Sequence, residues 1–282
     1  MKTILPILFA AAVSSSNWAS AEILVKSGDK IAFLGDSITQ AGWSQPSGYV
    51  RLVMEGLKAN GIQAEALPAG ISGHKSDQML ARLEKDVLSK KPQWMTLSCG
   101  VNDAWHGANG VPLDEAMAAR EKYNATVSAR GTYKKNITDI IDRATAAGVR
   151  PVILTATVIK EELDGPLNQK VAPYNEFLRG LAKEKKIPLA DLNAMFHEAI
   201  KAANKPGTNV LTSDGVHMNV EGDQLMATGV LQAFGLNAKQ IEKAKTAWAP
   251  LVAAGKAAQE KQAEARRARQ EKAAKEKAAQ QK

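Results

Sequence analysis

Short apolar runs alternate along the chain with longer stretches in which apolar residues recur every three or four positions. The short runs have the length and composition of buried strands. They lie at residues 31–34, 64–67, 94–98, 152–155 and 187–190. The longer stretches have the spacing of amphipathic helices. They lie at residues 49–60, 76–89, 133–147, 168–185 and 220–234.

The alternation of strands and helices indicates the fold class. A helix between two strands forms a right-handed crossover, which makes the strands parallel and places helices on both faces of the sheet. Residues 22–236 therefore predict one α/β domain, with ligands bound beyond the carboxyl ends of the strands. The connection at residues 104–131 is too long for a turn. We expect it to be a lid or substrate wall, with an ordinary surface excursion as the alternative.

The first 21 residues have the pattern of a secretory signal peptide. Lys2 provides a positive charge, residues 4–13 are apolar, and Ala19-Ser20-Ala21 matches the site that signal peptidase cleaves. We therefore expect residues 1–21 to be removed and the protein to be exported, either periplasmic or secreted. A retained anchor is the alternative, but the apolar run is shorter than the roughly 18 residues that span a bilayer. No transmembrane segment is expected after signal removal.

The charge is concentrated at the C-terminus. The 282 residues include 37 Lys and Arg and 29 Asp and Glu, and the net charge of +8 by itself suggests an anionic partner. Residues 237–282, however, contain 12 basic and 5 acidic side chains, whereas residues 22–236 contain 24 of each. The domain is therefore electrically balanced, and no nucleic-acid partner is expected. The Ala/Lys/Glu/Gln-rich tail at 237–282 predicts a solvated helical or disordered extension, with contact to an anionic surface or polymer as the alternative.

Four polar clusters follow the predicted strands or precede the last predicted helix. They are Gly35-Asp36-Ser37, Gly70-Ile71-Ser72-Gly73, Gly100-Val101-Asn102-Asp103 and Asp214-Gly215-Val216-His217. We expect a parallel sheet to bring them to one edge. Together they contain the groups that acyl transfer requires: a nucleophile, a base, a group that orients the base, and hydrogen-bond donors for an oxyanion.

The residue types indicate individual roles. Ser37 lies at a strand-to-loop turn and is the expected nucleophile. His217 is the expected base, and Asp214, three residues earlier, is expected to fix its tautomer. Asn102 provides an amide donor and Gly73 allows close approach to its backbone N–H, so both suit an oxyanion hole.

Other polar residues near these clusters are expected to be structural. Asp36 and Asp103 are predicted to accept backbone N–H groups and hold their loops. Cys99 is the single cysteine, so no intramolecular disulfide forms, and it is predicted to pack as a small hydrophobic residue. His197 lacks the second histidine of a zinc-binding helix, and no metal site is predicted.

The four clusters, in this order and over nearly the whole span from 31 to 234, resemble the sequence blocks of the SGNH, or GDSL-type, hydrolase superfamily. The resemblance implies a three-layer α/β/α sandwich with a central, mostly parallel five-stranded sheet of the flavodoxin-like kind. It implies a catalytic triad of Ser37, Asp214 and His217. It further implies that the oxyanion hole consists of the N–H groups of Ser37 and Gly73 and the side chain of Asn102. No cofactor or metal is implied.

Residues 211–227 are also similar to bacterial exported members of this superfamily that are associated with acylated carbohydrates. This similarity favours an esterase for short acyl groups, such as O-acetyl, on a small-molecule or polysaccharide substrate. A lipolytic esterase or thioesterase of the lysophospholipase-like kind is the first alternative, and a non-catalytic binding protein is the second. Candidate substrate contacts are Trp43, His74, Trp105 and His106, although a surface or core position is equally expected for the two histidines.

Overall fold

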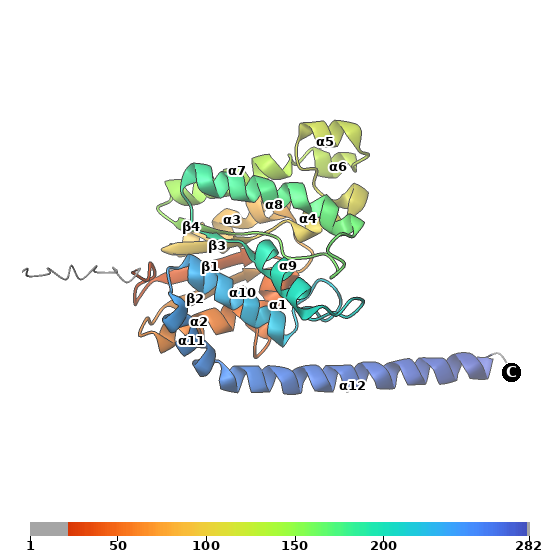
Figure 1. Ribbon diagram of the computed structural model, residues 1–282. Helices are drawn as coiled ribbons and strands as arrows, with labels where there is room; N and C mark the ends of the chain where they lie inside the picture. Colours follow the sequence, from red (N-terminus) through yellow and green to blue (C-terminus); the bar gives the residue numbers. More distant parts are fainter. Residues whose placement is uncertain (1–21, 281–282) are drawn as a thin grey trace, which may run out of the picture.

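A five-stranded sheet forms the centre of the protein (Figure 1). The computed structural model describes residues 22–280, so the signal peptide predicted for residues 1–21 lies outside the described residues. All neighbouring strands are parallel, in the order β2-β1-β3-β4-β5. This is the flavodoxin-like order, which confirms the predicted fold class. The strands are β1 (Lys30–Gly35), β2 (Glu65–Gly70), β3 (Trp94–Ser98), β4 (Arg150–Leu154) and β5 (Leu189–Ala190).

The inner strands are apolar along nearly their whole length because helices cover both of their faces. β3 is buried at every position, and β1 and β4 are buried at every position but the first. β2 lies at the edge and has one buried residue, Ala69. Its position explains why Pro68 is tolerated, since an edge strand does not need every backbone N–H for pairing.

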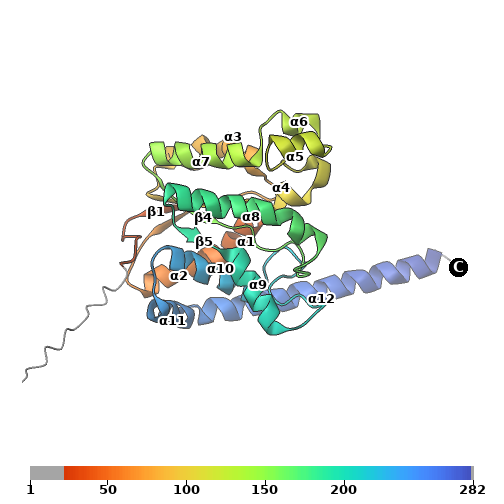
Figure 2. The same ribbon diagram turned by 45° about the horizontal axis from the view of Figure 1, so that its top comes forward.

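Helices on both faces of the sheet complete the predicted three-layer sandwich (Figures 1 and 2). Two helices that the sequence pattern did not predict, α1 (Ser37–Ser44) and α9 (Leu192–Ala203), start directly after strands and are capped by Asp36 and Asp191. One face carries α2 (Tyr49–Ala59), α10 (Val220–Ala233) and α11 (Ala238–Ala247). The other carries α3 (Ser76–Asp86), α7 (Tyr133–Ala146) and α8 (Pro166–Lys185).

The long connection after β3 folds into short helices that lie at one end of the sandwich (Figure 2). They are α4 (Val101–Trp105), α5 (Glu115–Arg120) and α6 (Ala125–Ser128). The hydroxyl of Tyr174 donates a hydrogen bond to the carbonyl of Val111 at 2.7 Å, and the N–H of Tyr133 donates to that of Pro112 at 2.8 Å. These bonds fasten the segment to α7 and α8, and its function as a lid or substrate wall stays a prediction.

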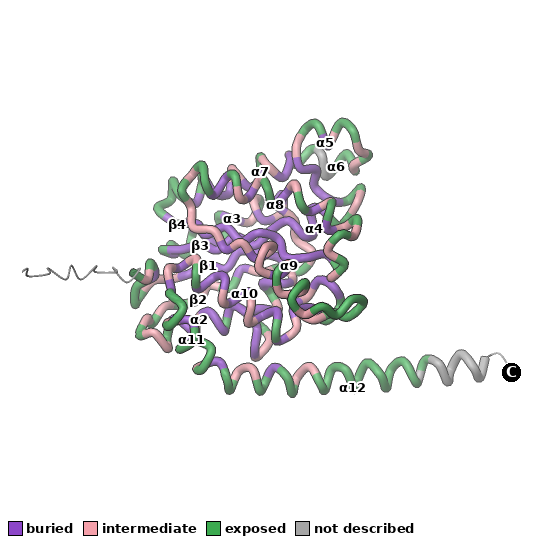
Figure 3. Tube along the Cα trace, in the orientation of Figure 1, coloured by how far each residue is buried: buried purple, intermediate pink, exposed green. Residues whose placement is uncertain are grey.

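The buried residues concentrate in the sheet and in the helix surfaces that face it (Figure 3). This core extends beyond residue 236, which differs from the solvated tail predicted for residues 237–282. Ile241, Ala244 and Trp248 are buried, and the Trp248 indole N–H donates to the carbonyl of Leu52 at 2.7 Å. Their spacing of three and four residues places them on one face of α11 and its continuation. The sequence prediction missed this stripe because residues 237–282 as a whole are rich in Ala, Lys, Glu and Gln.

The last helix, α12 (Ala249–Gln280), passes the start of α10 and projects beyond the body of the protein (Figure 1). Gly255 is buried at this crossing, where a Cβ atom would lie 2.0 Å from the Ser47 hydroxyl, and Lys256 pairs with Glu221 at 3.4 Å. Residues 261–270 are all exposed, as expected for a solvated helix. Within residues 22–280, no helix is both long enough and apolar enough to cross a membrane.

Candidate active site

Ser37 is the first residue of α1 and follows the end of β1 by two positions. The carboxylate of Asp36 caps this helix, with Oδ1 accepting the N–H of Ile38 at 2.9 Å. Asp36 is 2% exposed, and burial raises its pKa to about 6. The prediction that Asp36 holds the turn is therefore confirmed. The turn is tight, because a Cβ atom on Gly35 would lie 2.0 Å from the Thr39 hydroxyl.

His217 and Asp214 lie on the loop that leads into α10. An antiparallel bridge between Thr212 and Met218 closes this loop. Asp214 Oδ2 lies 2.7 Å from His217 Nδ1, and His217 Nε2 lies 2.9 Å from Ser37 Oγ. The structure thus brings the three side chains of the predicted triad into one line of hydrogen bonds.

The environment of Asp214 keeps it ionised. Partial burial acts to raise its pKa, but the backbone N–H groups of His217 and Val216 and the imidazole of His217 lower it overall below the usual value. The side chains of Asp214 and His217 are 48% and 37% exposed. The site is therefore open to solvent on the side of the base.

The predicted oxyanion donors lie beside Ser37. Asn102, on α4, is 5% exposed, and its amide donates to the carbonyl of His74 at 3.1 Å and to Asp36 Oδ2 at 3.3 Å. Both hydrogens of the amide therefore have acceptors in this structure, and donation to an oxyanion would replace the longer bond, to Asp36 Oδ2. Gly73 adopts a φ of +75°, which favours glycine. No acceptor within residues 22–280 binds its N–H.

Asp103 supports the same edge, as predicted. Its Oδ1 accepts the N–H of Ser76 at 2.9 Å, where α3 begins. The residue is 1% exposed, and burial raises its pKa to about 6. Cys99 is also buried, as predicted, and burial raises the pKa of its thiol.

Arg82 was missed by the sequence analysis. It lies on α3 with a side chain that is 10% exposed. Its guanidinium donates to the carbonyl of Gly35 at 2.9 Å and to His74 Nδ1 at 3.1 Å. Arg82 therefore connects the turn before Ser37 with the loop that contains Gly73. The available signal was its position one turn after the buried Met79, on a face where a solvated arginine is not expected.

The four candidate substrate contacts lie in different surroundings. His74 accepts from Arg82, and burial followed by the charge of Arg82 lowers its pKa. His106 has its pKa lowered by burial and by the charge of Lys75. Trp105 is 39% exposed next to it. Contact of these three with substrate stays a prediction.

Trp43, the fourth candidate, lies at the far end of α1 from Ser37. Trp43 lies six positions after Ser37, or about 9 Å along the helix axis. Trp43 borders a cleft formed with α2 and Leu251. The 104–131 segment does not line that cleft, so the two regions do not form one slot.

The chain matches the model of the GDSL-like lipase/acylhydrolase family over residues 33–225. It is 26% identical over 223 residues to an acetylxylan esterase of Geobacillus stearothermophilus, which covers 75% of this chain and 96% of that protein. The solved structure of the acetyl xylan esterase AlAXEase is 31% identical, with a TM-score of 0.60, over 72% of this chain and 98% of that one. The uncharacterized lipoprotein YqeF of Bacillus subtilis (strain 168) is 23% identical over 230 residues, 72% of this chain and 87% of that one.

The fold and these matches define a serine hydrolase that acts on carboxylic esters. More particularly, the chain belongs to the GDSL-like lipase/acylhydrolase family. The resemblance inferred from the four sequence clusters is confirmed.

Proposed function

We propose that the protein is an exported serine esterase that removes short acyl groups, O-acetyl above all, from carbohydrates. The observation that most directly supports this proposal is the line of hydrogen bonds from Asp214 through His217 to Ser37. Such a line activates a serine hydroxyl, which is otherwise a weak nucleophile.

In the proposed reaction, Ser37 Oγ attacks the ester carbonyl carbon while His217 Nε2 takes the hydroxyl proton. The oxyanion accepts hydrogen bonds from the N–H groups of Ser37 and Gly73 and from the Asn102 amide. When this intermediate collapses, His217 gives its proton to the leaving alcohol and the acyl group stays on Ser37. A water molecule then attacks the acyl carbon and gives a proton to His217. The Ser37 oxygen leaves and takes that proton back, which releases the acid.

Two features support a short acyl group on a large alcohol. The side chains of Asp214 and His217 are partly exposed, so a bulky alcohol can approach the proposed base. The proteins named acetylxylan esterases align over almost their full length. In solved catalytic mutants of one of them, the replaced aspartate and histidine are three positions apart, like Asp214 and His217.

The alternative of a lipolytic esterase would need a deep apolar slot for the acyl chain. Such a slot was expected between Trp43 and the 104–131 segment, but the cleft beside Trp43 is lined by α2 and Leu251 and contains several charged residues. The substrate with a short acyl group therefore remains the proposal.

Acetate release from a panel of acetylated polysaccharides tests the proposal. We expect release by the wild type and up to a ~10⁶-fold loss in Ser37→Ala, with a loss of ~10²- to 10³-fold in Asn102→Ala. A series of 4-nitrophenyl esters of increasing chain length separates the alternatives. Preference for long chains with no release from any polysaccharide would favour the lipolytic enzyme. Failure of a fluorophosphonate to label Ser37 would favour a binding protein.

The two ends of the chain belong to the proposal as well. Residues 1–21 have the pattern of a signal peptide, and one relative is named a lipoprotein, so we propose export to the periplasm or the medium. The exposed part of α12 is proposed to be separable from catalysis. Deletion of residues 256–282 should leave turnover of a small ester unchanged and alter only retention on anionic surfaces or polymers. Loss of that turnover would contradict this division.

A further inference from the structure

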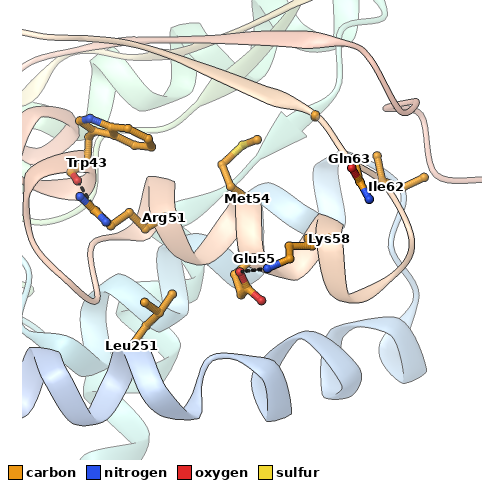
Figure 4. A pocket seen from close by; sticks show the side chains of 9 residues that line it. Trp43, Arg51, Met54, Glu55, Lys58, Ile62, Gln63 and Leu251 are labelled. Atoms are coloured by element: carbon orange, nitrogen blue, oxygen red, sulfur yellow. Dashed lines mark hydrogen bonds and ion pairs between the residues drawn. The ribbon is translucent and has the colours of Figure 1, made fainter.

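A second concave surface lies along α2, apart from Ser37 and His217 (Figure 4). It is a cleft of about 410 Å³. Trp43 of α1 lies at one end and Gln63, in the loop before β2, at the other, with Leu251 of α12 below (Figure 4). Its volume is in the range of small-ligand sites.

Trp43 is held in place at the end of this cleft. The Arg51 guanidinium lies 5.1 Å from the centre of the indole ring, and its Nε donates to the carbonyl of Trp43 at 2.5 Å. Even so, Trp43 is 38% exposed, one of few large hydrophobic side chains so exposed within residues 22–280. An aromatic face fixed in this way binds a flat apolar surface with little further loss of conformational entropy.

The rest of the cleft mixes polar and apolar groups. Glu55 and Lys58 form an ion pair at 3.4 Å along its wall, and the amide of Gln63 is exposed. Met54 and Leu251 add apolar surface. Sugar rings have this character too, with apolar C–H faces and hydroxyl groups around their edges. A lipid tail would remove these charged groups from water without offering them hydrogen bonds.

The cleft also begins a short distance from Ser37 along α1. The axial distance from Ser37 to Trp43 is about 9 Å, and α2 extends the surface by about 10 Å from Arg51 to Lys58. Gln40, between Ser37 and Trp43 on α1, is exposed, and its side chain accepts the N–H of Ser72 at 3.0 Å. Exposed side chains therefore lead from the proposed nucleophile to the cleft.

We propose that this cleft binds sugar residues of the same polysaccharide whose acyl group enters the active site, with Trp43 stacked on one ring. This proposal rests on the proposed function for its choice of substrate. The sugar residues in the cleft would belong to the same polymer chain as the reacting ester, but would lie further along it.

The test uses catalytically inactive protein and a polymer without acyl groups. Ser37→Ala in the full chain should bind deacetylated xylan oligosaccharides in isothermal titration. Adding Trp43→Ala should weaken binding at least about tenfold, which corresponds to about 1.4 kcal/mol. Leu24→Ala, which alters a side chain of equal exposure near the N-terminus, is the matched control and should have no effect.

A second measurement reports on the residue itself. Oxidation of tryptophan by N-bromosuccinimide, followed by mass spectrometry, should be slowed at Trp43 when the oligosaccharide is present. Equal affinities of the Ser37→Ala protein with and without Trp43, together with unprotected oxidation, would overturn the proposal. Dimerisation that depends on Trp43 would also overturn it, because the cleft would then join two copies of the chain. The binding measurement requires no hydrolysis. A negative result there would therefore contradict the cleft proposal alone, whereas a negative acetate-release assay would contradict the proposed esterase function.

Discussion

Replacement of Asp214 by asparagine tests the proposed triad with almost no change in volume. Asp214 Oδ1 accepts the N–H groups of Val216 at 3.0 Å and His217 at 2.8 Å, while Oδ2 faces His217 Nδ1 at 2.7 Å. The asparagine oxygen must take the place of Asp214 Oδ1, because an NH2 group there would face two N–H donors. The NH2 group then faces His217 Nδ1.

This orientation selects the wrong tautomer of His217. Nδ1 must accept a hydrogen bond, so the ring proton lies on Nε2, which faces Ser37 Oγ at 2.9 Å. Nε2 then has no lone pair for the serine proton. We expect kcat for 4-nitrophenyl acetate to fall by ~10⁴-fold, as for the same change in serine proteases, or about 5 kcal/mol of transition-state stabilisation.

The assay compares kcat and the urea unfolding midpoint of the wild type, Asp214→Asn and Asp29→Asn. Asp29 lies at the amino end of β1, where Oδ2 accepts the N–H of Lys26, and the same chemical change there should leave kcat unaltered. Asp214 is 48% exposed, so its replacement should hardly move the unfolding midpoint. A loss of less than about tenfold in folded Asp214→Asn would refute the tautomer argument.

Other substitutions test the packing that supports the site. Burial raises the pKa of Asp223 to about 7, so the folded protein favours the protonated carboxyl, and the free energy of unfolding falls as pH rises from about 4 through 7. Urea unfolding should show roughly 2–3 kcal/mol less stability at pH 8 than at pH 5 from this group. Asp223→Asn should remove that dependence, and an unchanged pH profile would contradict the assignment. Arg82→Met should lower kcat for 4-nitrophenyl acetate about tenfold with little change in KM, because it displaces the proposed oxyanion donors. A tenfold rise in KM with unchanged kcat would argue against this role. Trp248→Ala should lower the free energy of unfolding by about 3–5 kcal/mol, whereas a loss below 1 kcal/mol would mean that α11 is not part of the core.

The fold was predictable from the sequence because the inner strands are almost entirely apolar. β1, β3 and β4 are buried on both faces, so they appear as uninterrupted apolar runs. α1 could not be recognised in the same way, since its buried residues include Thr39 and Gly42, whereas α9 has apolar residues at helical spacing and was recognisable. α11 was missed because residues 237–282 as a whole are rich in Ala and Lys, which conceals the buried stripe of Ile241, Ala244 and Trp248.

The candidate site was predictable where function depends on residue type, and not where it depends on tertiary contacts. Ser37, Asp214 and His217 lie in motifs that name the chemistry, and the structure brings them together. Arg82 has no motif, because its two partners are a backbone carbonyl and a histidine nitrogen from other elements. The separation of Trp43 from the 104–131 segment likewise depends on the course of α2, which no local pattern specifies.

Three buried aspartates occupy equivalent places at the edge of the sheet that contains the site. Asp36, Asp103 and Asp223 each accept a backbone N–H at 2.9 Å where a helix begins, at α1, α3 and α2 respectively. A carboxylate at a helix N-terminus is favoured by the helix dipole and by the unpaired N–H groups there. Burial nevertheless raises the three pKa values to about 6, about 6 and about 7.

These positions explain why such carboxylates are kept although burial disfavours their charge. α1 begins with Ser37, the loop of Gly73 leads into α3, and α10, which contains Asp223, begins three residues after His217. Asp36 and Asp103 therefore fix the starts of two segments that contribute to the proposed site, and Asp223 connects the start of α2 to α10, the helix that follows His217. Apolar side chains of the same size would pack at lower electrostatic cost but could not hold a backbone N–H. The stability lost when Asp36 and Asp103 ionise is thus a consequence of holding the segments of the proposed nucleophile and oxyanion donors in place.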